Sequence, residues 1–329
     1  MIRAKLPLLG ALLGCLVAFS APASFAAERT KVILSVGSIT ATNWPGLIAQ
    51  EKGFFRDEGL DVELIQAGQS SKAAQQVMAG VAQFGSSSMV DAFRAIDGGG
   101  DLVIFMNSLA QGIHSLVAAK NIKSVADLKS KRVMVGGQKD ITGLWWYAMA
   151  RNFKLDGTKD VDLLFSGSTA NRTAALASGG IEASVLSPPN SFQLIDKGFT
   201  DLGPVAGYLG EFPMMVYHVN KTWAASNNDK IAAFIRAHNR AVTFLLDPKN
   251  KDESCQILAK ASGSSVEDAA RTLDLALKVN GFVPTAMISD ETLERVRSTL
   301  VSEGDLKEPV KPITAFYDVR FAKAAEQGK

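Results

Sequence analysis

The segment Trp44–Leu64, WPGLIAQEKGFFRDEGLDVEL, decides the fold because it joins a helix, a stop and a strand over a short length of chain. Pro45 suits the first turn of a helix, where its missing N–H would be unpaired anyway, and Gly53 suits the end. Apolar and acidic residues then alternate over Leu60–Ile65, as in a half-buried strand. With the apolar run Lys31–Val36 upstream, the segment predicts a β–α–β unit.

The same order of strand, polar loop and helix recurs as far as about Val219. This alternation predicts a parallel α/β architecture, and the length of 329 residues favours two lobes because single cores stop growing near ~250 to 300 residues. After Val219 the pattern changes to long amphipathic helical segments. These helices need an apolar partner surface, so we expect them to pack on one of the earlier sheets.

The N-terminal residues are typical of a secretory signal peptide. A charged start, an apolar stretch over Leu6–Phe19 and the small residues SAPASFAA predict a signal over residues 1–26 and a mature chain that begins at Ala27. An alternative is a lipoprotein cleavage box, because LLGC ends at Cys15. Leu13 is unusual in such a box, and the apolar run continues beyond the cysteine, so we favour a periplasmic protein released from its signal.

Charge and cysteine content restrict the partners. Removal of the signal takes away Arg3 and Lys5 from 35 basic residues and nothing from 33 acidic ones, which leaves the mature chain formally neutral. A neutral chain has no basic field to attract nucleic acid or anionic lipid, so local groups must hold any charged ligand. Only Cys255 remains after processing, so no intramolecular disulfide is expected.

Polar loops precede most of the predicted helices: SITATN, GQSSK, GSSSM, GGQKDITG and SGSTANR. In a parallel α/β sheet such loops gather at the carboxyl edge, where ligands bind. The free N–H groups of helix N-termini there favour an anion or a carbonyl oxygen. The alternative for each single loop is that its Ser, Thr or Asn only caps a helix, as Thr42 or Asn43 could do. Taken together, the loops favour one small ligand.

Two side chains are individual candidates for ligand contact. Trp44 begins a helix at a loop, although packing against a neighbouring helix is an equally good role. Arg172 lies one turn into the helix after GST and could pair with a carboxylate or sulfonate, or could be a solvated surface residue. The aromatic run Trp145–Tyr147 points in different directions around a helix, so at least two of its members are expected to pack in the core.

Signatures of catalysis are sparse. His114, His218 and His238 are scattered without metal-ligand spacing, so each is expected to be a surface or packing residue. The sequence has no G-x-S-x-G elbow, phosphate-binding loop or G-x-G-x-x-G motif. Cys255 lies in an amphipathic helical segment and is interpreted as a buried small hydrophobe. We therefore expect a protein that is not an enzyme and that uses no cofactor and no metal.

Three segments, GLIAQEKGFFRDEGLDVEL, SVADLKSKRVMVGG and ALASGGIEASVLSPP, resemble the nitrate, sulfonate, taurine and thiamine-precursor family of periplasmic substrate-binding proteins of ABC transporters. The resemblance extends from about Val32 to Val219. It implies a two-lobed α/β fold of the type II periplasmic-binding-protein kind, with parallel-rich sheets, two hinge crossings and a helical C-terminal segment. It also implies a monomer that binds a small ligand between its lobes and delivers it to permease and ATPase subunits.

Carried onto this chain, the resemblance places the crossings near Gly112–Ser115 and Met214–Tyr217. The first lobe then comprises residues 27–113 and 217–329, and the second lobe residues 114–216. Residues expected to bind the ligand are Thr40, Asn43, Trp44, Gln69, Ser70, Ser86, Ser87, Gly137, Asp140, Thr142, Ser168, Thr169, Arg172, Pro189 and Phe212.

The chain departs from sulfonate-binding members in two loops. The second-lobe loop GGQKDITG contains less serine than theirs, and SPPN replaces a tryptophan–aspartate pair. Asp140 in that loop could repel an anion or pair with Lys139. We therefore expect a small organic anion, a sulfonate, carboxylate or aromatic acid. The alternatives are a thiamine-pyrimidine precursor, an enzyme on the same scaffold and a sensor subunit.

Overall fold

The computed structural model describes residues 1–2, 29–209 and 213–328. The first of two five-stranded sheets has the order β2-β1-β3-β10-β4. Its strands are β1 Thr30–Val36, β2 Leu60–Gln66, β3 Phe84–Ser88, β4 Leu102–Leu109 and β10 Met215–Asn220. Strand β1 pairs in parallel with β2 and β3, whereas β10 lies antiparallel between β3 and β4.

The second sheet has the order β7-β6-β8-β5-β9. Its strands are β5 Ser115–Ala118, β6 Arg132–Val135, β7 Asp162–Phe165, β8 Ala183–Leu186 and β9 Thr200–Pro204. Strand β6 pairs in parallel with β7 and β8, and β5 pairs antiparallel with β8. Each sheet therefore combines a parallel core with an antiparallel strand that connects to the other sheet.

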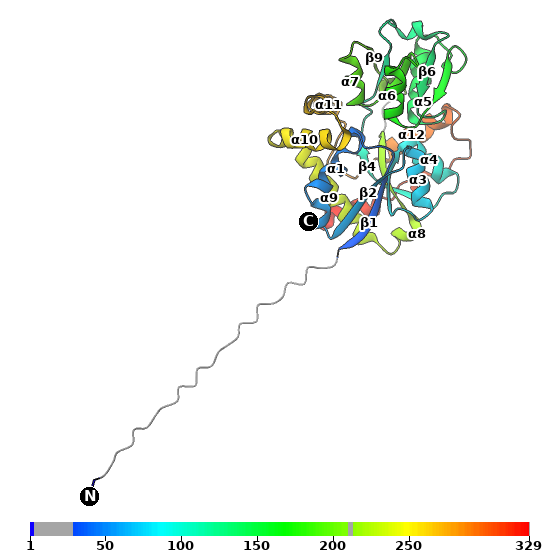
Figure 1. Cartoon of the computed structure of the whole chain (residues 1–329). Coiled ribbons are helices and arrows are strands. Elements are labelled where there is room, and N and C mark those ends of the chain that lie inside the picture. The colour runs from blue at the N-terminus through cyan, green and yellow to red at the C-terminus, as the bar shows by residue number, and fades with distance from the viewer. Residues whose placement is uncertain (3–28, 210–212, 329) are drawn as a thin grey trace.

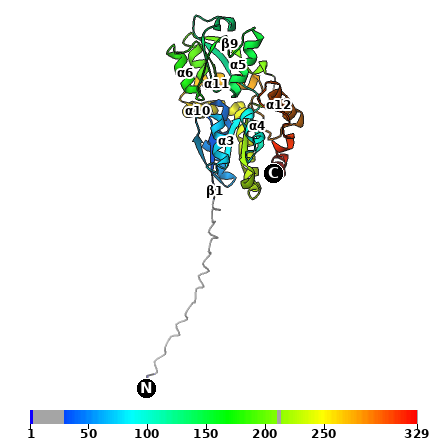
Figure 2. The same cartoon turned by 90° about the vertical axis from the view of Figure 1, so that its right-hand side faces the viewer.

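The chain passes between the two sheets twice, once from β4 to β5 and once from β9 to β10. Figures 1 and 2 show the sheets, each with its own helices, as two bodies one above the other. We call the first sheet with its helices the first lobe and the second sheet with its helices the second lobe. This arrangement confirms the predicted α/β fold with two lobes, two crossings and a helical C-terminal segment.

The helices flank these sheets. In the first part of the chain they are α1 Trp44–Glu51, α2 Phe54–Asp57, α3 Ser70–Met78, α4 Met89–Asp97, α5 Ile141–Asn152, α6 Thr169–Ala177 and α7 Asn190–Ile195. After β10 they are α8 Lys221–Ala224, α9 Asn228–Leu246, α10 Lys251–Ser262, α11 Val266–Lys278, α12 Asp290–Ser302 and α13 Val319–Gln327. Helices α9 and α13 contact β2 and β4, and α12 contacts α4, so the C-terminal helices pack on the first lobe as predicted.

The opening β–α–β unit forms as predicted, with Pro45 in the first turn of α1 and Gly53, at φ 75°, directly after that helix. The prediction that Thr42 or Asn43 caps the helix is wrong in detail. Asn43 occupies the capping position, but its Oδ1, the atom that would accept a cap bond, has no partner among the described residues. Its side-chain NH2 group donates to the Ser38 carbonyl oxygen and to the Thr42 hydroxyl.

The aromatic core of the first lobe centres on Phe234 of α9. Its ring centroid lies 4.6 Å from that of Phe84, 5.0 Å from those of Phe55 and Tyr217, and 5.7 Å from that of Phe105. Edge-on and tilted ring contacts of this kind add stability beyond the apolar area that they bury. A residue of the C-terminal segment therefore holds together strands and helices from the first part of the chain.

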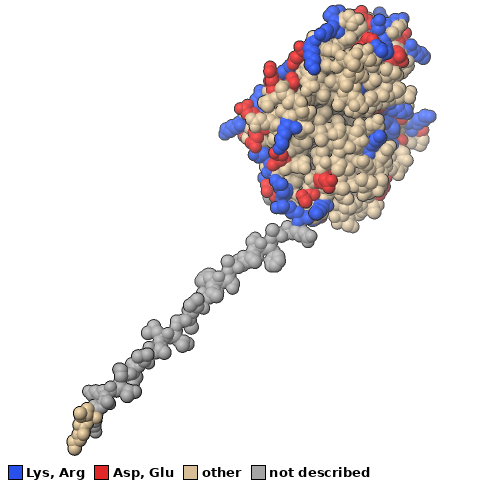
Figure 3. Space-filling model, viewed as in Figure 1, with Lys and Arg blue, Asp and Glu red and all other residues tan. Residues whose placement is uncertain are grey.

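The surface carries both signs of charge. On the face shown in Figure 3, basic and acidic side chains are interspersed rather than separated into patches. Within the described ranges, no helix is long and apolar enough to cross a bilayer. The signal predicted over residues 1–26 falls almost entirely outside the described part of the chain.

Candidate functional site

The carboxyl edges of the two sheets face each other. Because β1, β2 and β3 run in parallel, the loops after them emerge at one edge of the first sheet, and the loops after β6 and β7 emerge likewise from the second. A cavity of about 330 Å³ lies between these edges. It is lined by Gln69, Ser70, Ser71, Asp91, Arg94, Gly136, Gly137, Gln138, Lys139, Asp140, Phe165 and Gly167. We call it the interlobe cavity.

The lobes touch at this cavity. A Cβ atom on Gly167 of the second lobe would lie only 2.1 Å from the Cγ atom of Gln69 in the first lobe. Four of the predicted ligand residues line the cavity, namely Gln69, Ser70, Gly137 and Asp140. A larger cavity of about 760 Å³ lies elsewhere, between α2, α9 and α13, and draws its walls from the first lobe alone. The interlobe cavity, in contrast, combines polar loops that follow strands of both sheets.

The three serines at the end of β3 have different roles. The Ser88 hydroxyl caps α4 by accepting from the Asp91 backbone N–H at 3.1 Å. The Ser87 hydroxyl donates to the Ser70 carbonyl oxygen at 2.9 Å and lies 2.8 Å from His218 Nε2. Because the Ser87 proton is used, His218 donates from Nε2. Burial lowers the pKa of His218 to about 3, so its ring is neutral.

Ser86 differs from its neighbours because its fully buried hydroxyl has no hydrogen-bond partner among the described residues. It lies opposite Tyr217 in the pairing of β3 with β10. The hydroxyls of Tyr217 and of Ser108, near the end of β4, are also buried, and they interact with each other. Buried polar groups normally find partners, so the Ser86 hydroxyl is a candidate for contact with a ligand or with bound water.

The loop before α5 is held rigidly by its own side chains. The Asp140 carboxylate accepts from the Thr142 backbone N–H at 2.8 Å and from the Gly143 backbone N–H at 3.3 Å. The Thr142 hydroxyl accepts from the Gly136 backbone N–H at 2.7 Å. Asp140 is thus an N-cap, and Lys139 pairs with Asp305 instead of Asp140, at 3.4 Å.

Substitution of Thr142 by Val is expected to destabilise the second lobe by about 1–2 kcal/mol, because the Gly136 N–H and the Asp140 carboxylate both lose a partner. Thermal unfolding without ligand measures this loss. Thr173→Val is the control, since its hydroxyl donates only to the carbonyl oxygen one turn back in α6. An unchanged melting temperature for Thr142→Val would contradict the locking role.

Arg172 is a buried structural residue, with 2% of its surface exposed. Its guanidinium donates to the carbonyl oxygens of Ser166 at 2.7 Å, Gly167 at 3.1 Å and Val185 at 3.3 Å, and to the Thr169 hydroxyl at 3.2 Å. The interpretation as a solvated surface arginine is therefore wrong. The protein itself also occupies the guanidinium N–H groups that would form a bidentate contact with a ligand acid.

Trp44 packs into the first lobe instead of facing the interlobe cavity. The indole is fully buried, its Nε1 donates to the Ser254 carbonyl oxygen at 3.0 Å, and its ring meets Phe282 edge-on. This is the packing role that was left open for Trp44. Asn43 beside it is also buried, and its Oδ1 atom has no partner in the described structure.

The remaining predicted residues occupy loop and capping positions. The Thr40 and Thr42 hydroxyls lie 2.9 Å apart, and Ser168 caps α6 by accepting from the Asn171 backbone N–H at 3.3 Å. Pro189 follows a cis peptide bond at the start of α7. Phe212 lies outside the described residues.

The interlobe cavity is also lined by two residues that the sequence analysis did not identify, Asp91 and Arg94. Asp91 and Arg94 are one turn apart on α4 and form an ion pair at 2.9 Å. Burial and the neighbouring Asp140 both raise the pKa of Asp91. The sequence MVDAFRAI could have revealed this ion pair, because Asp91 and Arg94 are three residues apart and so lie on one face of the helix.

All three histidines are buried, and burial lowers the pKa of each to about 3, so the prediction of packing positions is confirmed and a surface position is excluded. His114 lies on the crossing from β4 to β5, with its ring centroid 5.2 Å from that of Trp145. Trp145 and Trp146 are both buried, as expected for core members of the aromatic run.

The two lobes, the two crossings and the cavity between facing carboxyl edges define a protein of the periplasmic-binding-protein fold. A sequence model described as "NMT1/THI5 like" matches residues 42–251, more than half of the chain. The chain therefore belongs to the NMT1/THI5-like family. This confirms the resemblance to the nitrate, sulfonate and thiamine-precursor group of binding proteins.

Individual relatives agree with this assignment. The "Putative binding protein YtlA" of Bacillus subtilis is 23% identical over 85% of this chain and 86% of its own length. The nitrate/nitrite binding protein NrtA of Synechococcus elongatus is 27% identical over 50% of this chain and 40% of its own length. The solved alkanesulfonate-binding protein SsuA of Xanthomonas axonopodis superposes with a TM-score of 0.73 at 17% identity, covering 88% of this chain and 99% of that protein.

Proposed function

We propose that the protein is the extracytoplasmic solute-binding component of an ABC importer. The interlobe cavity, whose walls come from the facing carboxyl edges of two sheets joined by two crossings, is the observation that carries this proposal. In the proposed cycle the open form admits a solute, closure buries it between the lobes, and permease and ATPase subunits recognise the closed form. Neither lobe alone supplies the complete set of contacts.

The proposed solute is a small organic anion, such as a sulfonate, a carboxylate or an aromatic acid. Two cations, Arg94 and Lys139, line the cavity, and α3 begins at its wall. Helix N-termini and cations both stabilise negative charge. Of the predicted residues, Gln69, Ser70 and Gly137 are the proposed contacts in the cavity wall.

A second candidate is a thiamine-pyrimidine precursor, which one observation favours. Asp91 and Asp140 line the same cavity, one from each lobe. Carboxylates accept hydrogen bonds, so they suit the amino group of a pyrimidine better than they suit an anion. The family description "NMT1/THI5 like" is compatible with such a ligand.

Binding without chemistry is the proposed activity. Cys255 is buried, and burial raises the pKa of its thiol, which keeps it protonated and a poor nucleophile. The proposal includes a signal peptide over residues 1–26, a periplasmic location and a monomer. It places the lobes at residues 27–113 with 217–329 and at residues 114–216.

A thermal-shift screen tests the proposed function. The probes are small carboxylates, alkanesulfonates, aromatic acids and aminopyrimidines, each also examined at high salt. A ligand at ~100 times its dissociation constant stabilises the bound state by ~2.7 kcal/mol, which raises the melting temperature by several degrees. A rise in melting temperature with acids supports the proposal that the solute is a small organic anion. A rise with aminopyrimidines alone supports the thiamine-pyrimidine precursor instead. No shift with any probe contradicts the proposal.

Ser86 and Ser87 provide a matched pair of variants. Ser86→Ala is expected to weaken solute binding about tenfold and to leave the apo melting temperature unchanged, because the hydroxyl has no partner to lose. Ser87→Ala is expected to lower the apo stability by about 1–2 kcal/mol, because the Ser70 carbonyl oxygen and His218 lose a partner. Titration calorimetry and thermal unfolding measure the two effects. If Ser86→Ala lowered the apo stability as much as Ser87→Ala and left the affinity for the solute unchanged, Ser86 would have no role in binding.

A further inference from the structure

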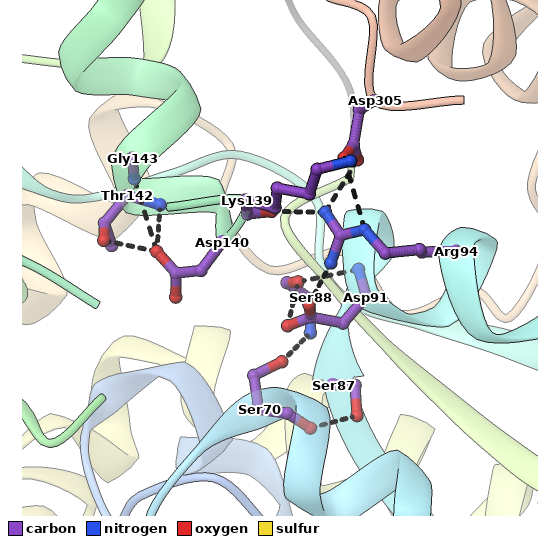
Figure 4. Close-up of polar contacts among 10 residues, drawn as sticks. All are labelled: Ser70, Ser87, Ser88, Asp91, Arg94, Lys139, Asp140, Thr142, Gly143 and Asp305. Atoms are coloured by element: carbon purple, nitrogen blue, oxygen red, sulfur yellow. Dashed lines mark hydrogen bonds and ion pairs between the residues drawn. The ribbon is translucent and has the colours of Figure 1, made fainter. Parts of the chain in front are cut away.

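A cluster of charged side chains joins the lobes beside the interlobe cavity. Arg94 lies on α4 of the first lobe, and Asp305 follows α12, which also packs on the first lobe. Lys139 belongs to the loop before α5 in the second lobe. Figure 4 shows these three side chains converging from their separate elements.

The first-lobe half of the cluster is preorganised. The Arg94 guanidinium donates from Nε and Nη2 to the two Asp305 oxygens at 3.3 and 2.6 Å, and from Nη1 to Asp91 at 2.9 Å. Asp305 is held in turn, since its side chain is 2% exposed and its backbone N–H donates to the Leu300 carbonyl oxygen at 2.8 Å. Gly304, at φ 68°, makes the turn after α12 that presents Asp305. Two carboxylates thus fix the guanidinium before the second lobe arrives.

The second-lobe half contacts this pair through a single residue. The Lys139 carbonyl oxygen accepts from Arg94 Nη2, and the Lys139 ammonium lies 3.4 Å from an Asp305 oxygen. Lys139 therefore contacts both charges of the pair: its carbonyl oxygen contacts the Arg94 guanidinium, and its ammonium contacts the Asp305 carboxylate. The loop that carries Lys139 is rigid because of the Asp140 and Thr142 bonds described above.

Lys139 also lines the interlobe cavity, and so do Arg94 and Asp140. On its other side Lys139 lines a second cavity of about 630 Å³, together with Asp305 and Glu303. The cluster thus stands in the wall between the two cavities. Glu303 adds a parallel contact, because it pairs with Arg151 of α5 at 2.7 Å.

We propose that the contacts of Lys139 with Arg94 and Asp305 form an electrostatic clasp that stabilises the closed arrangement of the lobes. The clasp sets the population of the closed form in the absence of solute. The clasp forms only when the second-lobe loop reaches the position in which it walls the cavity. The clasp therefore favours the closed conformation, and a solute that contacts the same loop favours it too. The inference concerns regulation of the proposed binding site, but closure itself is observable without any solute.

Distances between two spin labels, measured by double electron–electron resonance, test the clasp. Labels at Lys72→Cys on α3 and Asn171→Cys on α6 report the separation of the lobes, in a Cys255→Ala background. Lys139→Met removes only the ammonium of an exposed side chain, so folding is not at risk. Without solute, it is expected to lower the ratio of closed to open protein about fivefold, and Lys139→Glu, which opposes Asp305, is expected to lower it further.

Salt and a matched variant complete the test. Raising NaCl from about 50 to about 500 mM should open the unsubstituted protein and have much less effect on Lys139→Met, because salt screens the pair that the variant has lost. Lys159→Met is the control, since Lys159 pairs with Asp156 within the second lobe. Distance distributions of Lys139→Met and Lys139→Glu that superimpose on that of the unsubstituted protein overturn the clasp. These readouts use no solute, so a failed ligand screen and a failed clasp remain distinguishable.

Discussion

Arg172→Met is expected to lower the free energy of unfolding by roughly 3 kcal/mol and to weaken binding of acidic and neutral solutes alike. Three backbone carbonyl oxygens lose their donor, and unsatisfied buried acceptors cost about 1–3 kcal/mol each. The guanidinium connects the end of β7 to β8, so its loss loosens the loop that carries Gly167 into contact with the first lobe. Chemical denaturation and calorimetry measure the two effects.

Arg132→Met is the matched control for this prediction. Arg132 is in the same lobe and is bound to Glu182 at 2.6 Å, but it is 42% exposed, so its removal should change stability little. If Arg172→Met kept full stability and lost affinity for acids only, Arg172 would be a ligand residue, and the structural role described here would be incorrect.

Phe234→Ala is expected to destabilise the protein by about 3–5 kcal/mol, the usual cost of a large buried aromatic side chain and of the cavity that remains. Phe234 lies on α9, whereas its ring neighbours Phe55, Phe84 and Phe105 come from the first part of the chain. The loss should therefore appear in the first lobe. Hydrogen exchange localises it, with faster exchange expected in β3 and β4.

Phe244→Ala on the same helix is the control, because Phe244 is only partly buried near the end of α9. Its removal should cost clearly less than removal of Phe234. Equal and small losses for the two variants would mean that the C-terminal helices do not complete the core of the first lobe.

Local pattern was sufficient to predict the opening β–α–β unit and the parallel α/β alternation, but not the antiparallel strands β5, β9 and β10. Proline at the start of α1, glycine after it and alternation along β2 are all effects within one turn or one strand, and each was found as expected. The gathering of polar loops at one edge also follows from parallel pairing. Within those loops the family resemblance indicated Gln69, Ser70, Gly137 and Asp140, and all four line the cavity.

Individual side-chain roles depended on partners that are distant in sequence. Trp44 donates to Ser254, and Arg94 binds Asp305, across more than two hundred residues in each case. No local pattern reveals such partners. Arg172 was misjudged for a related reason, because its acceptors are backbone carbonyl oxygens, which every residue carries and no sequence motif distinguishes.

The measurement that tests the central claim most directly is hydrogen exchange with and without the solute that raises the melting temperature most. If the solute is held between the lobes, protection should increase together at residues 67–71 of the first lobe and at residues 136–141 of the second, the loops that line the interlobe cavity. Protection confined to one lobe, or to the larger cavity between α2, α9 and α13, would contradict the account.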